Sequence, residues 1–250
     1  MKNLQQSLKQ VCALLMALSV LIANSVAQGN DFPTAAPEDV GVSSERLQRL
    51  SNTMQRYIDS NMLAGTVSLV SRNGKVIHVE SQGWKNKESN EPMTDDSIFV
   101  IMSMTKPIVS TALMMLYEEG NFLLTDPITD WIPELKGKQV VIEEDGIDYR
   151  MSAHRPITFR HVLSHTAGVD PSREVLTEEE LALLPRKATL EETLINRAPL
   201  PLSFHPGDDW QYGSSTDYVA LLVERISGQS LVDYLQEKIL DPLKMHDTSY

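Results

Sequence analysis

The strand-forming segments of this chain come early and are followed by a long helical block, and this order restricts the possible folds. Residues 65–70 and 75–80 read as strands, and Arg72-Asn73-Gly74 between them is typical of a hairpin turn. A third short extended piece spans residues 97–101. Because two or three strands do not make a stable sheet alone, the order predicts an α+β fold. An antiparallel sheet lobe joins an all-helical lobe, and the sheet is incomplete within these 250 residues.

Apolar periodicity and capping residues predict the helices. Ser43 or Ser44 begins a helix whose apolar stripe is formed by Leu47, Leu50, Met54 and Tyr57 or Ile58. Thr158 begins a helix that we expect to end at Gly168. The further predicted features are a surface hairpin over residues 140–151 that turns at Asp145-Gly146, a first helical turn at Glu178-Glu179-Glu180, capping patterns at Thr189/Glu192 and Ser230/Asp233, and a stripe of Tyr218, Leu221, Leu222 and Ile226 closed by Gly228.

The charge balance argues against polyanionic partners. Lysine and arginine total 22 and aspartate and glutamate total 34, which gives a formal net charge of -12. An acidic chain without a basic run is unsuited to nucleic acid or to an anionic membrane surface. We therefore predict no nucleic-acid partner; it is the motifs described below that indicate a small-molecule substrate, an ester or an amide. The sequence leaves the oligomeric state open.

The first 27 residues have the pattern of a secretory signal. Lys2 and Lys9 precede an apolar stretch over residues 11–22, and Ser25-Val26-Ala27 fits a small-x-small cleavage site. We predict cleavage after Ala27, export to a periplasm or to the medium, and no stable membrane insertion afterwards; the alternative is an uncleaved anchor. Cys12, the only cysteine, lies inside this segment. The mature chain would then have no disulfide, no thiol nucleophile and no cysteine-ligated metal.

Ser103-Met104-Thr105-Lys106 is the strongest chemical signal. It reads S-x-x-K, and an apolar helical run over residues 107–117 follows at once. Residues three apart on a helix share a face, so Lys106 would stand beside Ser103. A serine needs such a neighbouring base to act as a nucleophile. The free backbone N–H groups at a helix start would suit a developing oxyanion.

A second motif, residues 204–214, reads F-H-P-G-D-D-W-Q-Y-G-S. Pro206-Gly207 predicts a turn, and we expect Trp210 to anchor the loop in the core and so to fix Tyr212. A phenol near a lysine can be pushed towards phenolate and accept a proton. The alternative is a core tyrosine with a satisfied hydroxyl.

Other chemistries find little support in the sequence. His161 and His165 are spaced i, i+4, but no pattern supplies a further ligand, and we predict no metal. His165 is expected to bond backbone at the helix end. The chain contains no G-x-S-x-G elbow, no G-x-G-x-x-G and no P-loop, so an α/β-hydrolase and a nucleotide cofactor are unsupported. We expect no cofactor.

The motifs together resemble the β-lactamase-related serine hydrolases. These are S-x-x-K at residues 103–106, H-V-L-S-H-T-A-G at residues 161–168 and P-G-x-x-W-x-Y at residues 206–212. The family includes class C β-lactamases, D-alanyl-D-alanine carboxypeptidases and family VIII carboxylesterases. The resemblance covers essentially all of residues 28–250, which we treat as one hydrolase domain with its helical lobe over about 103–240.

The resemblance implies a role for each matching residue. Ser103 would be the acylated nucleophile, Lys106 its general-base partner and Tyr212 the proton shuttle to the leaving group. The backbone N–H of Ser103 would form half of the oxyanion hole. The segment over residues 161–168 would be a structural helix and turn beneath the site.

This chain departs from the family pattern in two ways. Many members carry asparagine two residues after the tyrosine, where this chain has Ser214, predicted to contact the substrate. A hydroxyl cannot make the two-ended contacts of an amide, which favours an ester over a β-lactam or peptide amide. The family's third motif, K-T-G or H-x-G on a later strand, does not occur in these residues, so we expect them to be an N-terminal portion of a longer protein.

The sequence therefore predicts an exported serine hydrolase that cleaves carboxylic esters through an acyl-enzyme. Two alternatives stay open at this point. One is a β-lactamase or D-alanyl-D-alanine carboxypeptidase that acts on β-lactams or peptidoglycan peptides. The other is a homologue that binds or retains an acyl group without turnover. The absence of the third motif from these residues is consistent with such a homologue.

Overall fold

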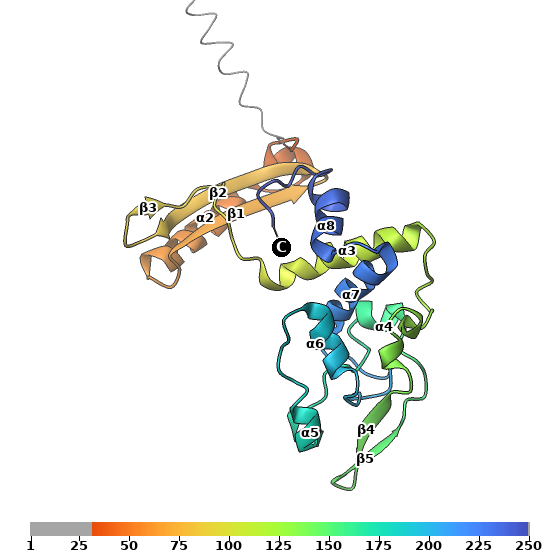
Figure 1. The fold of residues 1–250 in the computed structure, drawn as a ribbon. Helices are drawn as coiled ribbons and strands as arrows, with labels where there is room; N and C mark the ends of the chain where they lie inside the picture. Colours follow the sequence, from red (N-terminus) through yellow and green to blue (C-terminus); the bar gives the residue numbers. More distant parts are fainter. Residues whose placement is uncertain (1–31, 250) are drawn as a thin grey trace, which may run out of the picture. The chain divides into compact units, whose positions relative to one another are not determined.

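A computed structural model describes residues 32–249 (Figure 1). The predicted signal segment, residues 1–27, lies outside these residues. The chain divides into two compact units whose boundary falls between Phe99 and Val100. Among the described residues, no helix is both long enough and apolar enough to cross a bilayer.

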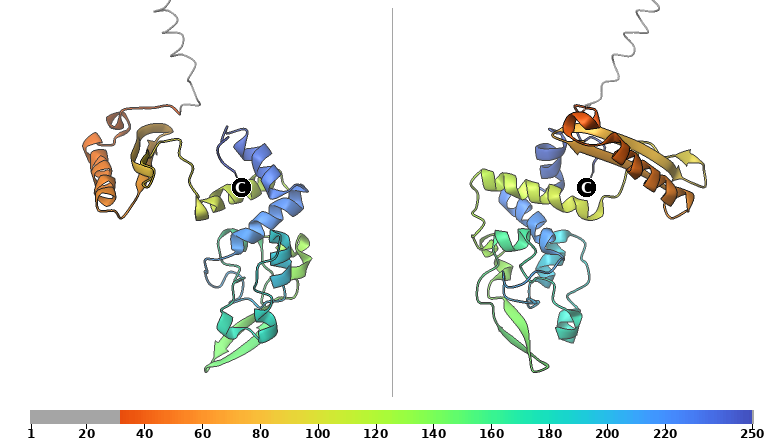
Figure 2. Two further views of the ribbon diagram at one scale, coloured as in Figure 1. Left: turned by 60° about the vertical axis from the view of Figure 1, so that its left-hand side comes forward. Right: turned by 180° about the vertical axis from the view of Figure 1, so that it is seen from behind.

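The first unit consists of a long helix and a small antiparallel sheet. A 3-10 turn, η1 (Pro37–Val40), precedes α2 (Ser44–Asp59), which begins where the Ser43 side chain accepts a hydrogen bond from Arg46 N. β1 (Gly65–Arg72) pairs with β2 (Lys75–Asn86) through a turn at Asn73 and Gly74, whose φ values are 52° and 72°. Helix α2 packs against β2, as Figure 2 shows. The predicted helix and hairpin are confirmed.

The third strand differs from the prediction. It is β3 (Glu91–Pro92), which pairs with the end of β2. Residues 97–101, expected to be extended, form no strand. The two edge strands of this sheet are β1 and the two-residue β3.

The second unit is built around α3 (Thr105–Glu118) and α7 (Ser215–Ser227), which pack against each other. The buried hydrophobic residues of α3 are Val109, Ala112, Leu113 and Leu116, and those of α7 run from Tyr218 to Val223. Helix α8 (Leu231–Leu235) and the π-helical segment η6 (Gln236–Leu240) extend this core. Phe122 stacks on Phe159 with ring centroids 3.7 Å apart. This apolar core fixes where the chain enters α3 and α7.

Shorter elements surround that core. They are η3 (Ile128–Asp130), η4 (Pro133–Leu135), β4 (Gln139–Glu144), β5 (Ile147–Ser152), α4 (Phe159–Leu163), η5 (Arg173–Val175), α5 (Glu178–Leu181) and α6 (Leu190–Arg197). The β4–β5 hairpin turns at Asp145 and Gly146, as predicted. The capping box of Thr189 and Glu192 at α6 is confirmed, as is the end of α7 at Gly228, whose φ is 71°. Antiparallel strands and a helical block confirm the α+β class.

Helix α4 is shorter than predicted. It begins at the Thr158 cap but ends at Leu163, with Ser164 as its C-cap, rather than running to Gly168. His165 has a φ of 58°, a left-handed conformation that breaks the helix. Residues 165–168 therefore form a turn, and the main chain of this turn bonds to the loop that carries Tyr212.

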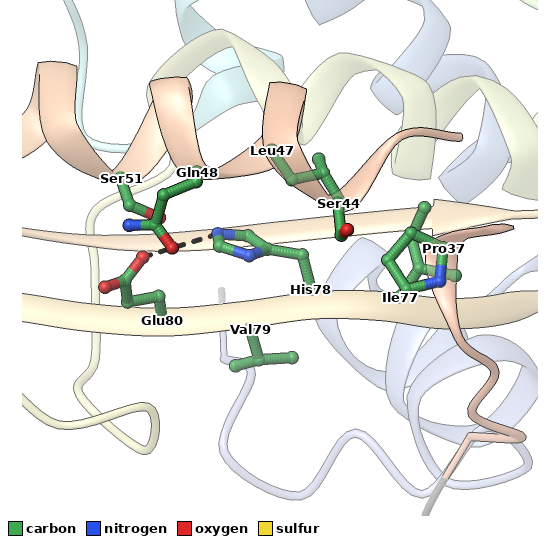
Figure 3. Close-up of a pocket in the computed structure, with 9 residues that line it drawn as sticks. All are labelled: Pro37, Ser44, Leu47, Gln48, Ser51, Ile77, His78, Val79 and Glu80. Carbon is green, nitrogen blue, oxygen red and sulfur yellow. Dashed lines mark ion pairs between the residues drawn. The ribbon is translucent and has the colours of Figure 1, made fainter.

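The first unit has its own cavity, between α2 and β2 (Figure 3). It encloses about 400 Å³, and His78 Nε2 within it lies 3.7 Å from Glu80 Oε2. Ser44 is among its lining residues, but no lysine or tyrosine lines the cavity. His78 is the potential base among the lining residues, and its buried Nε2 has no hydrogen-bond partner.

Candidate active site

The three predicted catalytic residues come together in the second unit. Ser103 lies in the 3-10 turn η2 (Met102–Met104), and Lys106 lies in the first turn of α3, which follows directly. Tyr212 lies in the loop that leads into α7. Because α7 packs against α3, the start of one helix and the loop before the other supply one site.

Ser103 Oγ is the centre of this arrangement. The Tyr212 hydroxyl donates a hydrogen bond to it over 2.6 Å, and Lys106 Nζ donates over 3.3 Å. Lys106 Nζ also lies 4.8 Å from the centre of the Tyr212 ring. Ser103 and Tyr212 are exposed and Lys106 is half-buried. The hydroxyl is thus open to a substrate and within reach of two proton-carrying groups.

The backbone before the nucleophile is strained. Met102 has a φ of 47°, although it carries a side chain. A left-handed conformation at a non-glycine residue costs on the order of 1–2 kcal/mol. Such strain persists where the surroundings impose it, often at functional sites. Here it falls on the residue that directly precedes Ser103.

The surroundings of Tyr212 favour its phenolate. The Lys106 side chain first, and the Ser103 hydroxyl second, hold the pKa of Tyr212 below its ordinary value, against the opposing effect of desolvation. The charge of Lys106 acts in the same direction. Because stabilising the phenolate makes the phenol a proton acceptor closer to neutral pH, the geometry suits Tyr212 to take the Ser103 proton.

The loop that carries Tyr212 is held by the turn after α4. Gly207 N donates to Thr166 O over 2.8 Å, and Gln211 N donates to His165 O over 2.9 Å. The prediction that Trp210 anchors this loop in the core is wrong, because its side chain is 60% exposed. Main-chain hydrogen bonds to the turn at His165 fix the loop instead. The pattern of side chains in the sequence does not reveal these bonds.

Ser214, predicted to contact the substrate, is bonded to another protein residue. Its Oγ donates to Asp170 Oδ1 over 2.6 Å, and its N–H donates to Asp170 Oδ2 over 2.8 Å. Ser214 is the N-cap residue of α7. The carboxylate near the positive end of this helix is also favoured electrostatically. The role of Ser214 in substrate recognition stays a prediction.

His165 lies beside the tyrosine. Its ring centroid is 5.0 Å from that of Tyr212. Burial first, and the Lys106 charge second, lower the pKa of His165, while Asp170 opposes them. The main-chain oxygen of His165 accepts the bond from Gln211, but its buried Nδ1 has no hydrogen-bond partner. The expected side-chain bond to the backbone is therefore not formed by Nδ1.

The histidines do not gather into a ligand set. Across residues 32–249, no group of three or more histidine, cysteine, aspartate or glutamate residues could hold a metal ion. His161 Nδ1 accepts a hydrogen bond from Thr158 N and so completes the start of α4. His154 and His205 stack with ring centroids 3.6 Å apart.

Sequence reasoning missed Asp170 and the position of His165. Asp170 is separated from Ser214 by 44 residues, and no spacing rule connects a loop aspartate to a distant helix cap. The sequence carries no signal for this contact, and Gly213 marks it only once the fold is known. A Cβ added there would overlap the Asp170 carboxyl group, with its Cγ at 2.7 Å, and a glycine without need of a positive φ indicates such a close approach.

Comparison with known proteins identifies the family of this chain. The sequence model of the beta-lactamase family matches residues 50–250. The chain belongs to the beta-lactamase family. Among curated family relatives, Esterase EstB of Burkholderia gladioli is 31% identical over 225 residues, which cover 87% of this chain and 54% of EstB. Penicillin-binding protein 4* of Bacillus subtilis is 26% identical, with 82% of this chain and 41% of that protein covered.

The fold also matches solved structures. EstCE1, described as a hydrolase with promiscuous acyltransferase activity, aligns with a TM-score of 0.67 and 27% identity, covering 79% of this chain and 51% of that one. The predicted beta-lactamase-like fold is thereby confirmed. The chain spans about half the length of the relatives it matches.

Proposed function

We propose that this protein is a serine hydrolase that cleaves carboxylic esters through an acyl-enzyme on Ser103. The observation that carries the proposal is the position of Ser103 Oγ, which is exposed and lies 2.6 Å from the Tyr212 hydroxyl and 3.3 Å from Lys106 Nζ. Esterases and penicillin-binding proteins among the relatives support the same class of reaction.

The first half of the reaction forms the ester. Ser103 Oγ attacks the substrate carbonyl carbon while its proton passes to Tyr212, whose phenolate is stabilised by the Lys106 ammonium. The tetrahedral intermediate then collapses, the bond to the leaving alkoxide breaks, and Tyr212 returns the proton to that alkoxide. An alcohol leaves, and the acyl group stays on Ser103.

The second half restores the enzyme. Water attacks the acyl carbon and gives its proton to Tyr212, and the bond to Ser103 Oγ breaks. Tyr212 then protonates the released serine oxygen, and a carboxylic acid leaves. In the role implied by the family resemblance, Lys106 would itself take the proton. The shorter distance to the phenol favours Tyr212 as the direct acceptor.

Ester turnover tests this proposal. The protein is expected to hydrolyse short-chain nitrophenyl esters, and Ser103→Ala is expected to abolish that turnover. Hydrolysis that survives in Ser103→Ala would rule the mechanism out. Ser110→Ala, a serine further along α3, serves as the matched control and is expected to retain activity.

Cleavage of β-lactams is the second candidate, because Penicillin-binding protein 4* is among the relatives. Ser214 argues against it, since its hydroxyl is engaged by Asp170 and offers no amide to a β-lactam side chain. Rapid turnover of a chromogenic cephalosporin with esters untouched would reverse the order of the two candidates. A stable adduct on Ser103 without turnover would instead indicate an acyl-binding homologue.

Export is part of the proposal. The charged and apolar pattern of residues 1–27 supports cleavage after Ala27. N-terminal sequencing of the protein recovered from the producing cell should begin at Gln28. A mature protein that still begins at Met1 would contradict this.

A further inference from the structure

We propose that Asp170 is the positioning residue of this site, and that its carboxylate, through Ser214 and Gly213, holds the Tyr212 hydroxyl against Ser103. This inference rests on the proposed function, because it assigns Asp170 a role in the acylation of Ser103. It differs from the family resemblance, which concerns the residues that touch the substrate.

The first observation is that both oxygens of one carboxylate are used on one residue. Asp170 Oδ1 accepts from Ser214 Oγ over 2.6 Å, and Oδ2 accepts from Ser214 N over 2.8 Å. Two bonds to a single residue fix its position and its orientation. Ser214 stands two residues after Tyr212, so the direction in which the chain leaves the tyrosine is set by Asp170.

The second observation is the close contact at Gly213. The backbone there lies so near the Asp170 carboxyl group that a Cβ would reach 2.7 Å from Cγ. A side chain at this position would displace the Asp170 carboxylate. The carboxylate therefore packs directly against the residue that follows Tyr212, as well as bonding to the next one.

The third observation is a link on the other side of the tyrosine. Ser203 Oγ lies 2.9 Å from Asp170 O and 2.9 Å from Gln211 Oε1, and its single proton can bond with either. Gln211 directly precedes Tyr212, and its N–H bonds to His165 O. Both neighbours of the tyrosine are thus tied to the segment over residues 165–170.

The position of the Tyr212 hydroxyl matters because proton exchange with Ser103 depends on the distance between the two oxygens. The Tyr212 hydroxyl lies 2.6 Å from Ser103 Oγ, and its side chain is 52% exposed, so the surrounding protein does not confine the ring on all sides. A displacement of about 1 Å can cost on the order of 10²-fold in rate. The main chain on each side of Tyr212 must therefore supply the precision.

Two substitutions separate the hydrogen bonds from the shape of the side chain. Asp170→Leu keeps a similar size and accepts no hydrogen bond. Asp170→Asn can still accept from Ser214 N with its amide oxygen and can donate to Ser214 Oγ with its amide nitrogen. Asp217→Asn is the control for charge, because Asp217 bonds to Ser214 with its main-chain N–H and not with its carboxylate.

The test measures the rate at which a fluorophosphonate probe labels Ser103, with and without Tyr212→Phe. Asp170→Leu is expected to slow labelling on the order of 10²-fold when Tyr212 is present and to have little further effect in the Tyr212→Phe protein. Asp170→Asn should recover most of the loss, and Asp217→Asn should stay near wild type. An equal loss in both backgrounds would overturn the proposal, because it would show general damage to the fold.

A second readout does not depend on catalysis. The ultraviolet titration of Tyr212, taken as the difference between each protein and its Tyr212→Phe counterpart, gives the pKa of this phenol. Removing a negative charge alone would lower that pKa, whereas moving the phenol away from Lys106 and Ser103 would raise it. Asp170→Leu is expected to raise it, and an unchanged or lowered value would overturn the positioning role.

The two readouts also separate this inference from the proposed function. If wild-type Ser103 is not labelled at all, the hydrolase proposal fails. The titration still shows whether Asp170 places Tyr212. If Ser103 is labelled and Asp170→Leu changes neither the labelling rate nor the pKa of Tyr212, only the positioning role of Asp170 fails.

Discussion

At the scale of single residues, the proposed mechanism requires Tyr212 to accept the Ser103 proton. Tyr212→Phe removes the hydroxyl that lies 2.6 Å from Ser103 Oγ and leaves the ring in place. Loss of a general base typically costs on the order of 10²–10⁴ in rate. We expect a fall of that size in kcat/KM for a nitrophenyl ester. Tyr117→Phe, which changes a tyrosine of α3, is the control, and a Tyr212→Phe enzyme as active as this control would contradict the assignment.

The pH dependence tests the part played by Lys106. A base acts only when deprotonated, so activity should rise with pH through the pKa of Tyr212, which lies below the ordinary phenol value. Lys106→Met removes the largest cause of that lowering, so the rising limb should move to higher pH. Lys106→Arg retains the positive charge and should move it less.

The same pair of variants distinguishes the two candidate bases. Arginine stays protonated and cannot accept a proton in this range. If Lys106 itself were the base, Lys106→Arg would be as inactive as Lys106→Met. Partial activity of Lys106→Arg, with a rising limb close to that of the wild type, is the outcome that the Tyr212 mechanism predicts.

At the scale of elements, the turn that precedes α3 stores backbone strain. Met102 has a φ of 47° and is 76% exposed, so a change there removes few contacts. Glycine adopts this conformation without a Cβ penalty. Met102→Gly is expected to raise the free energy of unfolding by up to about 1 kcal/mol, measured by urea denaturation. Met102→Val, which is β-branched, should lower it, and the opposite order would contradict the strain.

The start of α6 provides a test of the cap. Thr189 Oγ1 accepts from Glu192 N over 3.1 Å, and Glu192 Oε2 accepts from Thr189 N over 3.1 Å. Loss of such a capping side chain typically costs about 1 kcal/mol. Thr189→Ala should lower the free energy of unfolding by that amount, and Thr189→Ser should retain most of it. Equal stability of the two variants would show that the cap contributes nothing.

Helix caps and turns could be predicted because they depend on residues close together in the sequence. Part of the site could not, because it depends on contacts between residues far apart in the sequence. The helix caps at Ser43 and Thr189 and the Asn73-Gly74 turn depend on residues within a few positions, so the sequence alone indicates them. Helix α4 ends early because His165 adopts a left-handed conformation. No residue near His165 in the sequence predicts this conformation. Ser103 and Lys106 are three residues apart and were predictable as a pair, whereas the bond between Asp170 and Ser214 joins distant segments.

At the scale of the whole molecule, the apolar core of the second unit holds the start of α3 and the tyrosine loop together. Phe159 is fully buried and stacks on Phe122, with ring centroids 3.7 Å apart. Truncation of a buried phenylalanine costs about 3–5 kcal/mol. Phe159→Ala is expected to lower the free energy of unfolding of this unit by that amount in urea denaturation. Phe159→Leu fills more of the space and should cost less; equal losses would show that the cost does not depend on how much of the space is filled.

The activation of Ser103 is tested most directly by the intact mass of the protein after treatment with a fluorophosphonate probe. We expect a single adduct that is absent from Ser103→Ala and that forms more slowly in Tyr212→Phe, because Tyr212 and Lys106 activate Ser103. An adduct that persists in Ser103→Ala, or a wild-type protein that stays unmodified, would contradict this activation.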